Sequence, residues 1–364
     1  MNVNLKKLDI ICKNDSSIFN YFAWPTVTGL QDGRLAMVAS GYRIAHICPF
    51  GKCVISYSDD EGETWSLPTP VIDTPLDDRD GGICTFGSSG VIVTSFNNSV
   101  AFQRNSAKNA VGEHAKNALE QNLINSYLDI VEKKFDENKY LGSGFVISSD
   151  CGKTFGDIKR IPVSSPHGPT ALSDGKLLYV GRTFSAADAS TEIESFIIDA
   201  DGSFQKIGEI KNDTGLTFCE PHAIQTSSGK IIVHIRVQGK GRDKKFFTIF
   251  QAESYDNGKN FTKPHQILED CGGAPSHIIK TRDGMLIAAY GHREQPYGIK
   301  VMFSHDEGQT WDTDNVLCDG FCSGDLGYPS SVELKSGEIL TVFYAHESNE
   351  EPAKIYRAIW NYRG

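Results

Sequence analysis

The sequence SDDEGETW, from Ser58 to Trp65, recurs with small changes along the chain. The other copies, SSDCGKTF, SYDNGKNF and SHDEGQTW, begin at Ser148, Ser254 and Ser304. Every copy holds Ser, Asp and Gly at alternate positions, followed by Thr or Asn and then an aromatic residue. In such a segment the acidic side chain caps its own backbone, the glycine supplies a positive φ and the aromatic ring is buried beneath the turn. Apolar residues precede each copy, so each predicts the turn of a β-hairpin.

A second repeat underlies the first and consists of a short strand, a turn with glycine and a strongly apolar strand. Its six copies begin at Trp24, Gly81, Pro166, Glu220, Pro275 and Tyr328. We take the turn glycines to be Gly33, Gly90, Gly175, Gly229, Gly284 and Gly337. The copies are separated by roughly 45 to 85 residues, which is enough for four strands each.

Six four-stranded units that cannot each bury both faces stack radially, as in a propeller. We therefore predict an all-β fold: one domain over residues 1–364, a six-bladed β-propeller with four-stranded antiparallel blades. The chain ends before the last blade has its fourth strand, so we expect Leu5 to Cys12 to complete that blade and close the ring.

Residues 99–141 interrupt the pattern with a polar stretch rich in Ala, Asn, Glu and Lys. Within it Leu119, Leu123, Tyr127 and Val131 recur at helical spacing. We predict a helical insertion in blade two, between its second and third strands. It could be a plain decoration, a lid, or a contact between copies of the chain in a homo-oligomer.

The composition narrows the possible functions. A hydrophobic fraction of 39% with 35 glycines is typical of a turn-rich β protein with a sizeable core. The net charge of −10 argues against a nucleic-acid partner, which needs a basic face. No apolar run is long enough for a membrane span and no signal peptide is seen, so we expect a cytoplasmic protein without a membrane partner. The nine cysteines lack paired spacing, which favours reduced thiols over a metal site.

Strand alternation predicts where polar side chains gather. The starts of first strands and the ends of second strands should lie on one face, around the central opening. Glu220, Tyr328 and Trp24 start first strands. The ends of second strands add arginines, namely Arg43, Arg182, Arg236 and Arg293. Guanidinium groups suit a planar carboxylate or phosphate because they bind it in a bidentate way, although each could instead pair with a carboxylate at a blade edge.

The hairpin repeat is the Asp-box, and with the six-fold pattern the chain resembles the sialidase (neuraminidase) superfamily of six-bladed propellers. The resemblance covers nearly the whole chain outside the insertion. Glu220, Gly229 and Arg236 match the family's glutamate, turn glycine and second arginine of the carboxylate-binding triad. Tyr328 in GYPSSVELKSG matches the nucleophilic tyrosine, and Arg293 resembles the third triad arginine.

The resemblance implies a glycoside hydrolase that needs no cofactor and cleaves terminal acidic sugars, such as sialic acid. Glu220 would be the base for Tyr328, which would form the covalent intermediate. A neutral tyrosine avoids the repulsion between a carboxylate nucleophile and the carboxylate of the substrate. The arginines would hold that substrate carboxylate.

Two positions depart from the family pattern. Ala23 stands where the family has its first triad arginine, and Arg43 is better matched to the family's next arginine. The loop AHICPFGK, after Ile44, holds no acid where the family has its acid/base aspartate.

Candidate replacements for the acid are His46 and the DDRD segment, residues 77–80. Histidine can serve as an acid near neutral pH. Asp78 or Asp80 could serve if burial or a like charge raised the pKa of its carboxyl group. Arg79 of the same segment would contact the substrate. A plain ion-pair network in this loop is equally expected.

Three further histidines fall near the predicted opening, namely His167, His222 and His277. Singly, each could be a hydrogen-bonded core residue. As a set, with Trp24, they suggest contacts to sugar hydroxyl groups, because a ligand spacing for a metal is not established.

Two alternatives remain. The missing arginine and the missing acid could mean a uronate or a neutral sugar as the substrate, cleaved by hydrolysis or by elimination. The chain could also be a propeller that binds glycans without catalysis, although Glu220, Arg236 and Tyr328 together favour an enzyme.

Overall fold

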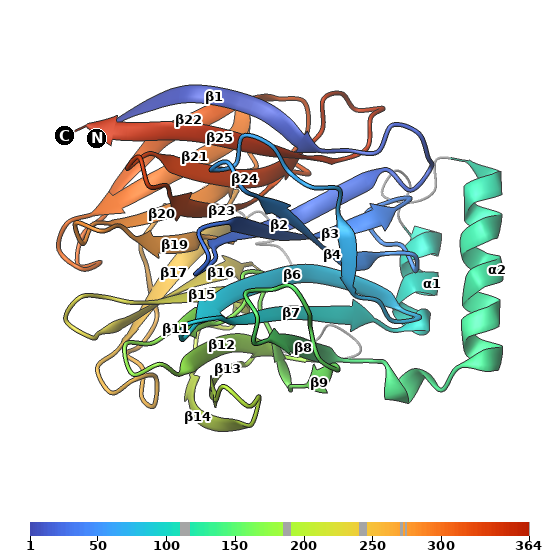
Figure 1. The fold of residues 1–364 in the computed structure, drawn as a ribbon, viewed down its shortest axis with the longest axis horizontal. Helices are drawn as coiled ribbons and strands as arrows, with labels where there is room; N and C mark the ends of the chain where they lie inside the picture. The colour runs from blue at the N-terminus through green and yellow to red at the C-terminus, as the bar shows by residue number, and fades with distance from the viewer. Residues whose placement is uncertain (110–116, 185–190, 240–245, 270–271, 274, 364) are drawn as a thin grey trace.

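A computed structural model describes residues 1–364 except 110–116, 185–190, 240–245, 270–271, 274 and 364. Six antiparallel sheets follow one another along the chain and form the six blades of a propeller (Figure 1). The predicted fold class is confirmed.

Four blades consist of strands that are consecutive in sequence. Blade one holds β2 (Tyr21–Gly29), β3 (Leu35–Arg43), β4 (Lys52–Ser58) and β5 (Thr69–Ile72). Blade two holds β6 (Asp77–Phe86), β7 (Gly90–Asn98), β8 (Ser143–Ser148) and β9 (Lys159–Arg160). Blade four holds β15 (Thr217–Gln225), β16 (Ile231–Gln238), β17 (Phe247–Ser254) and β18 (His265–Gln266). Blade five holds β19 (His277–Lys280), β20 (Leu286–His292), β21 (Tyr297–Ser304) and β22 (Asp312–Phe321).

The other two blades differ in how their strands are supplied. In blade three the first strand is split into β10 (Val163–Ser164) and β11 (Thr170–Ala171), which both pair with β12 (Leu177–Thr183). This blade continues with β13 (Ile193–Ile198) and β14 (Phe204–Ile210). Blade six joins β23 (Gly327–Glu333), β24 (Ile339–Ala345) and β25 (Lys354–Arg363) to β1 (Asn2–Cys12) from the other end of the chain. The predicted closure by the N-terminal strand is confirmed, with Leu5 opposite Trp360.

The Asp-box turns are held by local hydrogen bonds. In the first copy the Asp60 carboxylate accepts from the Ser58 hydroxyl (2.8 Å), from the Thr64 N–H (2.8 Å) and from the Thr64 hydroxyl (2.6 Å). These bonds lower the pKa of Asp60 to about 2. Gly62 has a φ of 87°, in the left-handed region that favours glycine. The turn joins β4 to β5, the third and fourth strands of blade one, as predicted.

The predicted insertion forms α1 (Val100–Asn109), α2 (Ala118–Lys134) and the short 3₁₀ helix η1 (Glu137–Lys139) between β7 and β8. Both α-helices lie beyond one end of the strands (Figure 1). The buried residues of α2 are Ile124, Leu128 and Val131, whereas Leu119 is 80% exposed. The predicted apolar face of this helix was therefore only partly right, since Val131 is buried as expected but Leu119 is not. Contact between copies of the chain through this insertion stays a prediction.

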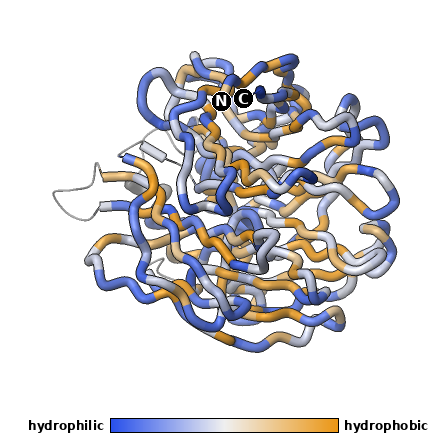
Figure 2. Tube along the Cα trace, turned by 90° about the vertical axis from the view of Figure 1, so that its left-hand side faces the viewer, coloured by the Kyte–Doolittle hydropathy of each residue, from blue (hydrophilic) through white to orange (hydrophobic). Residues whose placement is uncertain are grey.

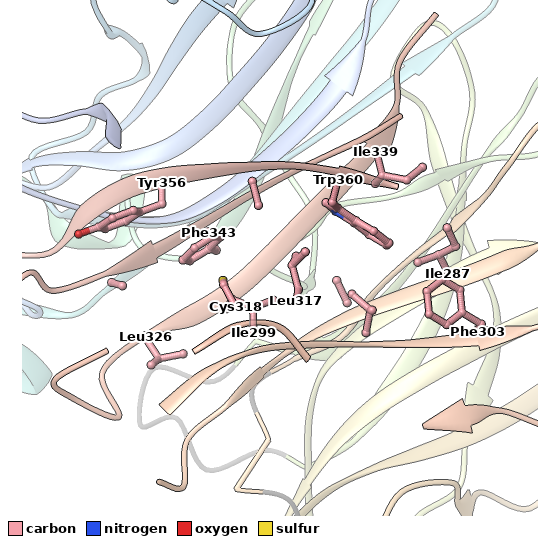
Figure 3. Packing of buried hydrophobic residues seen from close by; sticks show 14 of the residues in the cluster. Ile287, Ile299, Phe303, Leu317, Cys318, Leu326, Ile339, Phe343, Tyr356 and Trp360 are labelled. Carbon is pink, nitrogen blue, oxygen red and sulfur yellow. The ribbon is translucent and has the colours of Figure 1, made fainter. Parts of the chain in front are cut away.

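The core lies between neighbouring blades. Figure 3 shows one part of it, where Ile287 and Phe303 of blade five lie near Ile339 and Trp360 of blade six. Hydrophobic residues follow the strands, and many connecting loops are hydrophilic (Figure 2). Burial of these apolar faces stabilises the ring, since each blade alone would leave both faces in water. Over the described residues, no helix is sufficiently long and apolar to cross a membrane.

Candidate active site

Four first strands carry the same irregularity at the same place. Each has a β-bulge, and the bulged residue lies two positions before the pairs Thr26–Val38, Gly82–Thr94, His222–His234 and Ser330–Val342. The bulged residues have positive φ angles, 53° at Trp24, 48° at Asp80, 50° at Glu220 and 47° at Tyr328. A positive φ in a residue other than glycine costs on the order of 1–3 kcal/mol and is concentrated at functional sites. All four side chains line one cavity of about 270 Å³.

Blade two corrects the predicted register. Its first hairpin turns at Gly87, which has a φ of 56°, and Gly90 already belongs to β7, opposite Phe86. Gly90 is therefore not the turn glycine of this blade. The residue equivalent to Glu220 and Tyr328 is Asp80 and not Gly81.

Glu220 and Tyr328 touch inside the cavity, although 108 positions separate them in the chain. The Tyr328 hydroxyl donates to Glu220 Oε1 at 2.6 Å. Arg236 Nη1 donates to Glu220 Oε2 at 2.5 Å and to the Tyr328 oxygen at 3.0 Å. The three side chains thus form a closed hydrogen-bonded group at the floor of the ring opening.

The charges of this group keep the proton on the phenol and the negative charge on the carboxylate. Burial opposes ionisation of Glu220, but Arg236, the Tyr328 hydrogen bond and Arg293 together keep the pKa of its carboxyl group below the usual value. Burial and the Glu220 charge raise the pKa of Tyr328 well above its usual value. At rest the pair is therefore a neutral phenol that donates to a carboxylate, which can take its proton.

Asp80 is the second carboxyl group in the cavity. It is 6% exposed, its N–H donates to Ser40 Oγ at 3.0 Å, and its Oδ1 has no hydrogen-bond partner among the described residues. Burial raises the pKa of Asp80 to about 7; Arg79 and Arg43 oppose the shift, and Glu220 adds to it. A carboxyl group with this pKa is partly protonated at neutral pH and can act as an acid.

Four arginines line the cavity, namely Arg79, Arg182, Arg236 and Arg293. The Arg79 guanidinium lies 4.3 Å from the centre of the Trp24 ring and donates to the His46 carbonyl at 3.1 Å. Arg293 donates to the Leu326 carbonyl at 3.1 Å and lies 5.7 Å from the centre of the Tyr328 ring. The four arginines come from blades two, three, four and five, so they surround the opening on several sides.

Arg43 was wrongly predicted to contact the substrate. Its side chain is fully buried and forms an ion pair with Asp77 at 2.6 Å. Its guanidinium also donates to the carbonyl oxygens of Ala45 (3.3 Å), His46 (2.7 Å) and Asp78 (3.3 Å). These acceptors hold Arg43 inside blade one, where it joins the ends of β3 and β6.

The DDRD segment divides into a structural and a cavity-lining part. Asp78 is 1% exposed and accepts from the Thr74 N–H at 2.6 Å and the Thr74 hydroxyl at 2.8 Å, outside the cavity. Burial raises the pKa of Asp78 to about 6, but the carboxyl group does not reach the cavity, so its prediction as the acid was wrong. Arg79 and Asp80 line the cavity, and His46 lines it as well.

The other three predicted histidines do not line the cavity. His167, His222 and His277 cluster in the ring, with centroid distances of 5.6 Å (167–222), 5.0 Å (167–277) and 4.4 Å (222–277). His222 Nδ1 accepts from the Ile278 N–H at 3.1 Å, and His277 Nδ1 accepts from the Ser331 N–H at 3.2 Å. Each of these two bonds ties one blade to the next. These histidines are therefore not part of this cavity, and their predicted sugar contacts stay a prediction.

Several lining residues had no signal in the sequence pattern. The end of β7 and the helix α1 supply Phe96, Asn97, Asn98 and Phe102. The end of β12 and the residue after it supply Arg182, Thr183 and Phe184. The sequence analysis placed Arg182 at the opening because it ends a second strand. Of the aromatic and amide residues, only Phe102 comes from the insertion, and the others lie at or next to the ends of β7 and β12. In the described part of the chain, no cluster of three or more His, Cys, Asp or Glu could hold a metal ion.

Comparisons with known proteins agree with this architecture. The family model described as a BNR repeat-like domain matches residues 127–341, which is more than half of the chain, and the BNR/Asp-box repeat matches residues 56–67. A search of curated proteins gave no match.

Solved structures give the same fold at low sequence identity. A protein of unknown function from Dyadobacter fermentans is 18% identical, with a TM-score of 0.78 and full coverage of both chains. The NanB sialidase from Streptococcus pneumoniae is 15% identical, with a TM-score of 0.68 over 97% of this chain and 70% of that one. The intramolecular trans-sialidase from Ruminococcus gnavus is 14% identical, with a TM-score of 0.65 and 96% coverage of both chains. The chain thus belongs to the BNR repeat-like domain family, and its six-bladed propeller has the same fold as these sialidase structures.

Proposed function

We propose that this protein is a glycoside hydrolase that cleaves terminal acidic sugars, sialic acid or a close relative, through Tyr328 as the nucleophile. One observation carries the proposal: the Tyr328 hydroxyl donates to Glu220 at 2.6 Å inside a cavity lined by four arginines. The sialidase structures with the same fold support the substrate class.

The pair fits attack at an anomeric carbon that carries a carboxylate. A neutral phenol approaches such a carbon without the repulsion that a carboxylate nucleophile would meet. As the bond forms, Glu220 takes the phenol proton, and Arg236 stabilises the negative charge on both oxygens through Nη1. The step converts one displacement into two easier ones with a covalent intermediate between them.

Arg79 offers the positive charge that this chain lacks at Ala23, where the family pattern has an arginine. The Ala23 side chain is fully buried and carries no charge. Arg79 enters from the neighbouring blade and lies over the Trp24 ring, next to the position where the missing arginine would start. Arg79, Arg236 and Arg293 are therefore the three groups that we assign to the substrate carboxylate.

Asp80 is the group that we assign as the acid for the leaving oxygen. Its pKa of about 7 keeps part of the population protonated at neutral pH, and its Oδ1 has no partner in the described part of the chain. A buried carboxyl group of this kind protonates a leaving group more effectively than one with an ordinary pKa.

Release of the chromophore from an aryl α-sialoside tests the proposal. The wild-type protein should release it, and Tyr328→Phe should reduce release to the background level, because phenylalanine has no oxygen to attack. Tyr57→Phe, far from the cavity, is the matched control and should keep the wild-type rate. If no acidic glycoside in a panel is turned over, the proposal is wrong.

A second candidate is the same cavity acting on a uronate, by hydrolysis or by elimination. The observation in its favour is that Ala23, a buried residue, stands where the family has an arginine. Arg79 brings its guanidinium from a different position, so the anion site has a different shape. Product analysis separates the cases, because elimination leaves an unsaturated sugar that absorbs in the ultraviolet. A glycan array on which ligands bind and stay unchanged would instead favour a binding propeller.

A further inference from the structure

Asp325 lies in the loop between β22 and β23 and accepts hydrogen bonds from three side chains. Its Oδ1 accepts from the Tyr344 hydroxyl at 2.8 Å. Its Oδ2 accepts from the Tyr21 hydroxyl at 3.0 Å and faces His346 Nε2 at 2.9 Å. Burial opposes ionisation of Asp325, but His346 and His46 keep the pKa of its carboxyl group far below the usual value, so the group is a carboxylate. Neither the nucleophile pair nor the arginine set uses it.

Tyr21 connects this carboxylate to His46 in the cavity wall. Burial and the Asp325 charge raise the pKa of Tyr21 well above its usual value, so its hydroxyl keeps the single proton that it donates to Asp325. The Tyr21 oxygen then has only lone pairs to offer to His46 Nδ1, which lies 3.1 Å away. Asp325 Oδ1 is 3.5 Å from the same nitrogen. His46 Nδ1 thus faces two acceptors and must carry a proton.

The other nitrogen of His46 is open to the cavity. His46 is one of the lining residues, and its side chain is 27% exposed. Nε2 has no hydrogen-bond partner among the described residues, although the His46 ring stands edge-on to Trp24 at 4.8 Å. In a neutral imidazole with the proton on Nδ1, Nε2 is an acceptor.

The charged groups around His46 favour its neutral form. Burial is the largest influence and lowers the pKa of His46; Asp325 raises it, and the Arg79 and Arg43 guanidinium groups lower it. His46 is therefore neutral at pH 7, which does not suit the acid role considered for it from the sequence. Asp80, with the raised pKa, is the better acid of the two.

We infer that Asp325 is a positioning residue which, through Tyr21, fixes His46 with its proton on Nδ1, so that Nε2 accepts a hydrogen bond from a hydroxyl group of the bound sugar. This inference rests on the proposed function, because it assumes a sugar in the cavity. His46 is then a specificity-determining residue: a site built around an acceptor binds a sugar with the hydroxyl donor better than one without it. The network supplies orientation and leaves the chemistry to Glu220, Tyr328 and Asp80.

Nuclear magnetic resonance of the full chain with ¹⁵N-labelled histidine tests the tautomer without any substrate. His46→Gln assigns the His46 signals by their loss. In the wild-type protein near pH 7.5, Nδ1 should be the protonated nitrogen. Tyr21→Phe removes the phenol acceptor and should shift a large part of the population to the Nε2–H form. Tyr344→Phe removes a different phenol from the same carboxylate and should leave the tautomer unchanged.

The wild-type spectrum alone can overturn the inference. A wild-type His46 protonated on Nε2, or doubly protonated at pH 7.5, is incompatible with it, even if the variants fail to fold. An unchanged tautomer in folded Tyr21→Phe would show that the phenol does not set it.

Kinetics then test the role of Nε2 in binding. With an aryl sialoside that the protein cleaves, Tyr21→Phe should raise KM by roughly tenfold, the loss of about one hydrogen bond, and change kcat far less. A fall in kcat at constant KM would overturn the binding role. Absence of turnover would sink the proposed function, whereas the tautomer result would stand by itself.

Discussion

Acid should destabilise this protein through buried histidines that are neutral in the folded state. Burial lowers the pKa of His222 and of His234 to about 3, whereas an unfolded chain has a histidine pKa of about 6.5. The unfolded state therefore binds protons first as the pH falls. The stability that each neutral histidine contributes is complete above pH 6.5 and is lost progressively between pH 6.5 and about pH 3.

The size of the effect follows from the shift. Below pH 6.5 each such histidine lowers the free energy of unfolding by about 1.4 kcal/mol per pH unit. The loss reaches about 2 kcal/mol per histidine at pH 5. Asp78 and Asp80 act in the opposite direction, because burial raises the pKa values of their carboxyl groups and the folded state binds their protons first. The pH dependence of the stability of the whole protein therefore contains contributions of both signs. Only a comparison of the wild type with a variant that lacks one histidine isolates the contribution of that histidine.

His222→Gln provides that difference. Glutamine cannot titrate, and its side-chain oxygen can accept from the Ile278 N–H in place of Nδ1. Urea unfolding followed by tryptophan fluorescence should be measured at pH 7.5 and pH 5.0 for both proteins. The free energy of unfolding of the variant relative to the wild type should rise by about 2 kcal/mol between the two pH values.

His265→Gln is the matched control for this measurement. The His265 side chain is 54% exposed, so water solvates it in the folded and the unfolded state, and the relative free energy should change much less with pH. A difference between His222→Gln and the wild type that stays constant from pH 7.5 to pH 5.0 would refute the reasoning, because it would mean that His222 is charged or solvated in the folded protein.

Three further predictions concern the cavity and its support. Glu220→Gln should lower kcat/KM by about 10²- to 10⁴-fold, since the base for Tyr328 is lost, and a loss below tenfold in steady-state kinetics would contradict that role. The wild-type kcat/KM should fall as the pH rises above about 7, because Asp80 loses its proton there. Asp80→Asn should be slow, and its kcat/KM should not show this fall. If the variant shows the same fall, Asp80 is not the acid. Arg79→Met should weaken binding of an acidic sugar and cost less thermal stability than Arg43→Met, because Arg43 lies at 2.6 Å from buried Asp77 and Arg79 at 3.6 Å. Arg43→Met should remove the closer partner of Asp77 and destabilise the fold by about 3–5 kcal/mol, as thermal unfolding and calorimetric titration can check; the reverse pattern would contradict the separation of the two arginines.

The repeats of the sequence were sufficient to predict the ring. In each Asp-box the contacts join residues no more than a few positions apart, as between Ser58, Asp60 and Thr64, so the segment adopts the same turn wherever it occurs. The alternation of apolar strands with these turns gave the number of blades. It also placed Glu220 and Tyr328 at the opening, because both start first strands. The sequence therefore determined the architecture and the main pair of the candidate site.

Only the tertiary structure decided which polar groups reach the cavity. The hairpin of blade two turns at Gly87, which puts Asp80 and not Gly81 at the bulge. Arg43 stays inside because Asp77, from the next blade, binds it there. His222 faces a backbone N–H of the neighbouring blade, and Asp325 reaches His46 although the two residues lie near opposite ends of the chain. Apart from the turn at Gly87, these outcomes depend on a partner outside the residue's own blade, and a repeat pattern read along one chain does not contain the contacts that form when blades pack together.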